Sequence, residues 1–150
     1  MAQSFPVTPQ AIYDALSGDS TFAALIGTYK FENTVATLPA LSIKSPGEKL
    51  PQLRNVSGVE CLIHDTGTVA RRDYVSGSSD LVATWNVYLI AWGPSTGYEI
   101  TAAAKRVMEI FGGATATEVV AVSSGLGALA QTLVQIPEDS PILILPPPGP

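Results

Sequence analysis

The chain has 150 residues, 46% of them hydrophobic and 14% charged, so it is long enough to fold as one domain around its own core. Its 13 acidic and 8 basic residues give a formal charge of -5, which argues against a free-standing binder of DNA or of anionic membranes. One cysteine and one histidine exclude an internal disulfide framework and a zinc site made from those residue types.

The N-terminal residues MAQSFPVTPQ lack the basic, apolar and small-residue regions of a secretory signal. The longest uncharged apolar stretch, residues 81–93, is too short for a transmembrane helix and contains Asn86. We therefore expect a protein that is made and used without export and that has no membrane partner.

A first short helix is expected to begin at Thr8 and Pro9, because proline at the first helical position loses no needed hydrogen-bond donor. Ile12 and Leu16 then fall on one face of this helix. Gly18 is expected to end it.

A second short helix follows directly. Asp19 or Ser20 can cap its N-terminus, and Phe22 lies on its apolar side. Gly27 is expected to supply a left-handed exit. Together the two helices predict a small helical unit at the start of the chain.

Residues 38–44 predict a short strand bounded by Pro39 and Pro46, and prolines at both ends favour an edge strand. Residues 46–52 predict a loop.

The most regular part of the sequence comes next: a strand from Val59 through Gly67 to about Val75, a turn over residues 76–80, and a returning strand over residues 81–92. Twelve residues from 81 to 92 extend roughly 40 Å at about 3.3 Å per residue, so the far end of this hairpin should project beyond the domain.

The projecting tip carries the densest charged and aromatic cluster of the chain: Arg71, Arg72, Asp73 and Tyr74. Arginine and tyrosine are enriched where proteins contact one another. Such a tip is either a solvated loop or a site of subunit contact.

Alternation along the returning strand places apolar side chains on the face expected to be buried: Leu81, Ala83, Trp85, Val87, Leu89 and Ala91. The opposite face carries Tyr88 and Trp92 with Asn86 and Thr84. A mixed aromatic and polar face is either a second buried layer or a surface that another chain covers.

After Gly93, a helix is expected to start with a capping box of Thr96 and Glu99 and to end at Gly112. Its apolar positions recur at helical spacing: Ile100, Ala104, Val107 and Phe111.

Residues 117–122 predict a strand. Residues 128–136 fit both alternation and a four-residue spacing, and we favour a strand.

These elements predict an α+β fold, a mostly antiparallel sheet with a long hairpin, packed by one main helix and two short N-terminal helices. We expect a single domain over residues 1–145, with a last short strand over residues 142–145. The Pro-rich residues 146–150 are expected to form an extended tail.

No residue set predicts catalysis, a metal site or a cofactor. Gly125, Gly127 and Ala130 match a dinucleotide-binding fingerprint, but too little chain follows for the second half of that fold. His64 and Asp65 are adjacent strand residues that point to opposite faces, and Cys61 alternates with apolar neighbours as a small filler would. We expect no enzyme activity.

The order of segments carries a resemblance. FAALIG at 22–27 and PALSI at 39–43 precede the long hairpin, and WNVYLIAW at 85–92 leads into AAAKRVMEIFG at 102–112. Over almost the whole chain this order resembles the tail terminator proteins of long-tailed bacteriophages, also called minor tail or tail completion proteins.

The resemblance implies a virion protein at the head-tail junction, assembled in the host cytoplasm as a ring, typically a hexamer. Such a ring ends polymerisation of the tail tube and presents a docking surface to the neck or connector. In a contractile tail it also meets the sheath. The alternatives are another neck component such as an adaptor, a small nucleotide-binding enzyme, and a monomeric regulatory domain.

Overall fold

We describe a computed structural model of the chain, over residues 7–31, 38–44, 54–92, 97–117, 120–121 and 128–143. The helices are α1 (Pro9–Ser17), α2 (Ser20–Leu25) and α3 (Gly97–Ile110). The strands are β1 (Thr28–Phe31), β2 (Leu38–Pro39), β3 (Leu41–Lys44), β4 (Arg54–Asp73), β5 (Ser79–Trp92), β6 (Thr115–Ala116), β7 (Val120–Ala121) and β8 (Ala128–Pro137).

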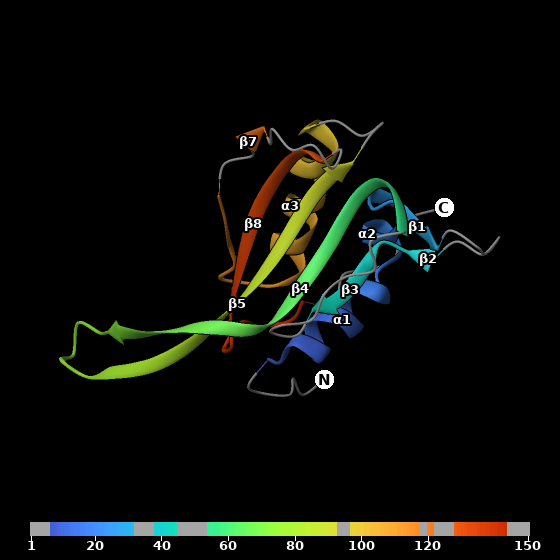
Figure 1. Ribbon diagram of the computed structural model, residues 1–150. Helices are drawn as coiled ribbons and strands as arrows, with labels where there is room; N and C mark the ends of the chain where they lie inside the picture. Colours follow the sequence, from blue (N-terminus) through green and yellow to red (C-terminus); the bar gives the residue numbers. More distant parts are fainter. Residues whose placement is uncertain are drawn as a thin grey trace.

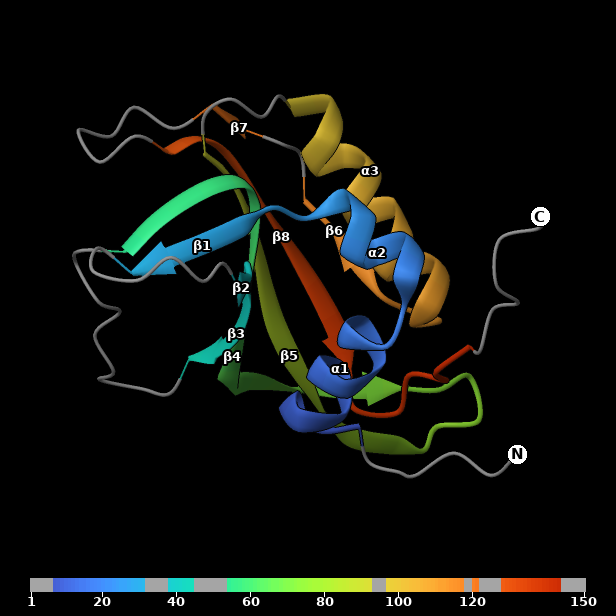
Figure 2. The same ribbon diagram turned by 90° about the vertical axis from the view of Figure 1, so that its right-hand side faces the viewer.

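The described strands form one eight-stranded sheet in the order β2-β1-β4-β5-β8-β6, with β3 beside β4 and β7 beside β8. All pairs are antiparallel except β3 with β4, which is parallel. The three helices lie on one side of this sheet (Figures 1 and 2). The predicted α+β class, with its mostly antiparallel sheet, is confirmed.

Both N-terminal helices are confirmed, and their caps explain where they begin. The Thr8 side chain accepts a hydrogen bond from the Ala11 N–H, and Asp19 accepts one from the Phe22 N–H at 2.8 Å. The left-handed exit expected at Gly27 is wrong, because positive φ occurs among the described glycines only at residues 58, 77 and 113. Gly27 is instead a close-approach position, since a Cβ there would collide with the Ser57 carbonyl.

The strand expected over residues 38–44 is divided into β2 and β3. At the break, the Ala40 carbonyl accepts a hydrogen bond from the Cys61 N–H, and the Ala40 N–H donates to Gly27. The parallel pairing of β3 and the existence of β1 were both missed, because short strands carry little periodicity. The strand expected over residues 117–122 is seen in part: β7 covers residues 120–121, Thr117 lies outside any strand, and residues 118, 119 and 122 lie outside the described range.

The long hairpin is confirmed and is longer than expected. Strand β4 pairs with β5 from Gly58 opposite Trp92 to Asp73 opposite Ser79, and the register shifts between Ile63 and Gly67, where two extra residues bulge from β4. The assignment of residues 128–136 to a strand is also confirmed as β8, which pairs with β5 over most of its length.

Helix α3 covers the sheet and closes the core. Its buried side chains are Ile100, Ala103, Ala104, Val107 and Ile110, followed by Phe111. Val59, Cys61, Ile63, Val87, Leu89, Ala91, Val134 and Ile136 face them from the sheet in one continuous cluster. The helix ends at Ile110, shortly before the glycines expected to terminate it, and φ at Gly113 is 79°.

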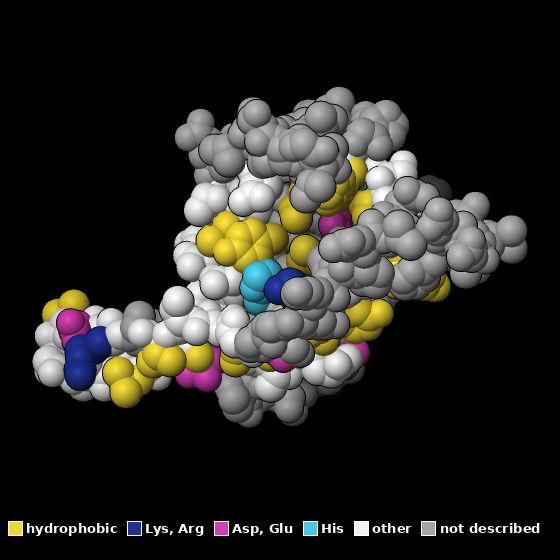
Figure 3. Space-filling model, in the orientation of Figure 1, with side chains coloured by type: hydrophobic (Ala, Val, Ile, Leu, Met, Phe, Trp, Pro, Cys, Tyr) yellow, Lys and Arg dark blue, Asp and Glu magenta, His cyan; other side chains and the backbone are white. Residues whose placement is uncertain are grey.

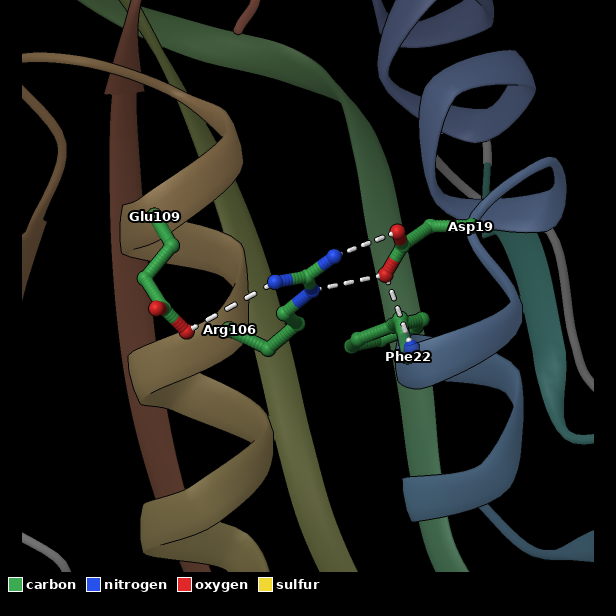
Figure 4. A network of polar contacts seen from close by, with 4 residues as sticks. All are labelled: Asp19, Phe22, Arg106 and Glu109. Atoms are coloured by element: carbon green, nitrogen blue, oxygen red, sulfur yellow. Dashed lines mark hydrogen bonds and ion pairs between the residues drawn. The ribbon is translucent and has the colours of Figure 1, made fainter. Parts of the chain in front are cut away.

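An ion pair joins the small helices to α3. Arg106 donates from Nε and Nη2 to the two carboxylate oxygens of Asp19, at 2.8 and 2.7 Å, while a second contact with Glu109 is longer at 3.9 Å (Figure 4). The same Asp19 carboxylate caps α2. This one side chain therefore fixes both the start of α2 and its distance from α3.

Several expectations fall outside the described residues. They are the loop over residues 46–52, the capping-box residue Thr96, the Gly125 and Gly127 turn, and the tail over 146–150. Of the last expected strand, the structure describes an isolated bridge between Ile142 and Phe111.

Candidate contact surface

The hairpin beyond the β4 bulge, residues 67–84, forms an arm that extends away from the body (Figure 1). The arm ends in a five-residue loop over residues 74–78, closed by a hydrogen bond from the Tyr74 N–H to the Ser78 carbonyl at 2.9 Å. Gly77 supports the turn with φ at 89°. Ordered backbone contacts therefore shape the arm up to its tip.

The predicted contact residues Arg71, Asp73 and Tyr74 all lie at this tip and are exposed. Arg71 donates from Nη1 to the Ser79 hydroxyl at 3.1 Å, and the Tyr74 hydroxyl donates to Asp80 at 2.9 Å. The backbone of Arg72 pairs with that of Asp80, and its side chain lies outside the described atoms. The tip is thus a charged and aromatic surface held by cross-strand contacts.

Sequence reasoning missed the apolar part of the arm. Val69 is 68% exposed and Leu81 is 65% exposed, and both lie on the face that continues from the core. Leu81 was expected on the buried face. The alternation was right, but the body ends before residue 81, so the same face emerges into solvent there.

The base of the arm is fixed to the body. Glu138 accepts a hydrogen bond from the Ala83 N–H through its side chain, at 3.1 Å, and donates its own N–H to the Ala83 carbonyl at 2.8 Å. Trp85 donates from its indole to the Val7 carbonyl at 2.7 Å. These contacts hold the arm in a defined direction relative to the body.

The other two predicted contact residues, Tyr88 and Trp92, lie elsewhere. They occupy the sheet face opposite the helices, where both are half-buried. The Tyr88 ring is tilted against His64 with centroids 4.7 Å apart, and Trp92 donates to the buried Glu60 carboxylate at 2.9 Å. Figure 3 shows apolar side chains gathered on this face and along the arm. The six predicted residues therefore form two separate surfaces.

The groups that could suggest chemistry are placed unfavourably for it. Cys61 is fully buried, and this burial raises the pKa of its thiol far above the usual range. Burial also lowers the pKa of His64, with Lys44 adding to the shift and Asp65 opposing it. Ala130 lies inside β8, where the fingerprint would require a helix. The described residues contain no group of three potential metal ligands.

Among the described residues, no helix is long and apolar enough to cross a membrane. Comparison with protein-family models, with characterised proteins and with solved structures finds no match to this chain.

Proposed function

We propose that this chain is a structural subunit of a bacteriophage tail that assembles as a ring on the tail tube. The ring ends tube polymerisation and presents a docking surface to the neck or connector of the head. Its partners are further copies of itself, the tube protein, the neck proteins and, in a contractile tail, the sheath. The chain would then reside in the virion at the head-tail junction.

The projecting arm is the observation that carries this proposal. An isolated two-stranded ribbon is only marginally stable in water, yet this arm continues past the body with Val69 and Leu81 exposed. Neighbouring exposed apolar side chains on a projecting ribbon fit a surface that another chain covers. Such an arm is expected in a subunit whose function is to bind other subunits. The segment order resembles that of tail terminators, which is why we propose the phage tail as the assembly.

The sheet face around Tyr88 and Trp92 supports a second contact of a different kind. It is half-buried, mixes aromatic and polar groups, and has no helix over it among the described residues. A ring subunit needs separate surfaces for its neighbours in the ring and for the tube or neck. Two separate surfaces fit that requirement.

The experiment is to omit the protein during tail assembly and to measure tube lengths and head joining by electron microscopy. We expect tubes of uncontrolled length that do not join heads. Tubes of normal length that still fail to join heads would instead indicate a neck adaptor. Normal tubes with normal joining would exclude both roles.

A further inference from the structure

The apolar strip of the arm has a shape and position that call for a partner. The register places Val69 opposite Ala83 and Arg71 opposite Leu81, so Val69 and Leu81 are diagonal neighbours on one face. Beyond Ala83, strand β5 pairs only with β4 among the described residues, because β8 ends at Pro137. The strip therefore has neither a side-chain cover nor a third strand within the described chain.

The same molecule carries an apolar groove between α3 and strands β6 and β8. Its volume is about 440 Å³. Ala104, Met108, Ala116 and Thr132 contribute to its lining, and the exposed side chains of Lys105 and Glu109 stand at the α3 rim. Met108 is 40% exposed, so its side chain is open to a partner. The groove is thus an accessible apolar surface with one charge of each sign along its edge.

The charges on the arm match those on the groove. Arg71 and Asp73 lie two residues apart on the Val69 face of β4, a separation of about 6.6 Å along a strand. Lys105 and Glu109 lie four residues apart on α3, about 6 Å along a helix. An arm laid along the groove can therefore pair Arg71 with Glu109 and Asp73 with Lys105 at the same time, with Leu81 beside Met108.

The arm leads away from its own body, so an arm and a groove of one molecule do not meet (Figure 1). We propose that the Val69 and Leu81 strip of each copy docks in the groove between α3 and β6 of the next copy. The contact joins two different surfaces and is heterologous, the type that forms a ring when the rotation between neighbouring copies closes. This inference rests on the ring assembly proposed above and names the surfaces that form it.

Site-directed crosslinking tests the contact directly. The only native cysteine, Cys61, is fully buried and will not interfere. Leu81→Cys and Met108→Cys are prepared as two separate proteins and mixed under mild oxidation, in solution or on tails if the chain assembles only there. We expect a crosslinked dimer that contains one copy of each variant. Leu81→Cys mixed with Ser17→Cys, an exposed position on α1, is the matched control and should give none.

Charge reversal gives an independent readout. Arg71→Glu and Glu109→Arg should each weaken association about tenfold, and the two changes together should restore it, because the pair is reversed as a unit. Glu99→Arg, an exposed position in the first turn of α3, should leave association unchanged. If the protein assembles but the Leu81→Cys and Met108→Cys variants form no crosslink, and the double charge reversal does not restore association, the docking is overturned. The proposed tail role is not affected by that result. If the crosslink forms and the double charge reversal restores the ring, but the ring has no effect on tubes, the docking is supported and the tail role is excluded.

Discussion

At the scale of single residues, Asp19 has two structural roles. It caps α2 and accepts both hydrogen bonds of the Arg106 fork. Asp19→Ala removes the cap and the ion pair together, and we expect a loss of about 1–2 kcal/mol in the free energy of unfolding. Asp19→Asn keeps an acceptor for the Phe22 N–H and should lose less than about 1 kcal/mol. Urea unfolding of the three proteins measures both values, and equal losses would show that the cap contributes nothing.

The same carboxylate predicts a pH dependence. The Arg106 hydrogen bonds hold the pKa of Asp19 below its ordinary value of 3.8, despite the opposing effect of burial. A lowered pKa means that the stabilisation is fully present above that ordinary value and is lost as the pH falls through the lowered one. The stability advantage of the wild-type protein over Asp19→Asn should therefore be constant from pH 7 to about 5 and should shrink below about pH 4. An advantage that persists unchanged in acid would contradict this assignment.

His64 offers a separate titration, and it is the only histidine of the chain. Burial and Lys44 lower its pKa from 6.5, because both disfavour the protonated ring. We expect its ring protons, followed by NMR, to titrate with a midpoint below 6.5, and Lys44→Met should move that midpoint back toward 6.5. Lys105→Met, on α3, is the control and should not. Since the unfolded chain binds this proton first, stability should fall as the pH drops below 6.5.

At the scale of elements, the arm and the core are separable. Between residues 64 and 86, the core cluster is contacted by Trp85 alone among the described residues, and Trp85 lies outside the segment from 71 to 81. Replacing residues 71–81 by Asn-Gly joins Ala70 to Val82, which already face each other, through a turn suited to a hairpin. We expect the free energy of unfolding to change by less than about 1 kcal/mol while self-association is lost. A large loss of stability would show that the arm belongs to the fold and not only to its contacts.

The elements also show what periodicity can and cannot predict. The sequence predicts the capped helices, because Thr8 and Asp19 mark where helices begin and the glycines after Phe111 mark where α3 stops. It also predicts the two faces of β5, because apolar residues alternate along that strand. The parallel β3 pair was not, since four residues have no measurable period. Gly27 shows the same limit: its sequence context suggests a turn, but its role is set by Ser57, thirty residues away.

At the scale of the whole molecule, surfaces are harder to predict than the core. Composition marks the charged and aromatic tip from Arg71 to Tyr74, whereas alternation places Leu81 on the buried face and says nothing of Val69, although both side chains are exposed. The groove beside Met108 has no sequence signal, because it is assembled from α3, β6 and β8. Whether a side chain on a long strand is buried depends on where the elements that cover the strand end. The relative positions of these elements cannot be predicted from a single sequence.

A heterologous contact makes one last prediction about the assembled molecule. The variant with residues 71–81 replaced by Asn-Gly, called armless below, retains the groove but lacks the outer arm with Leu81, and Met108→Arg retains the arm but places a charge in an apolar groove. Each variant alone should remain monomeric. When the two variants are mixed, the arm of Met108→Arg can enter the groove of the armless protein. No further contact can form, because the armless protein has no outer arm and the other groove is blocked. Native mass measurement should therefore find a one-to-one dimer and nothing larger. Wild-type protein under the same conditions should reach a closed ring, and armless protein added to it should reduce ring yield by capping open ends. Rings in the mixture of the two variants would mean that a different pair of surfaces joins the subunits.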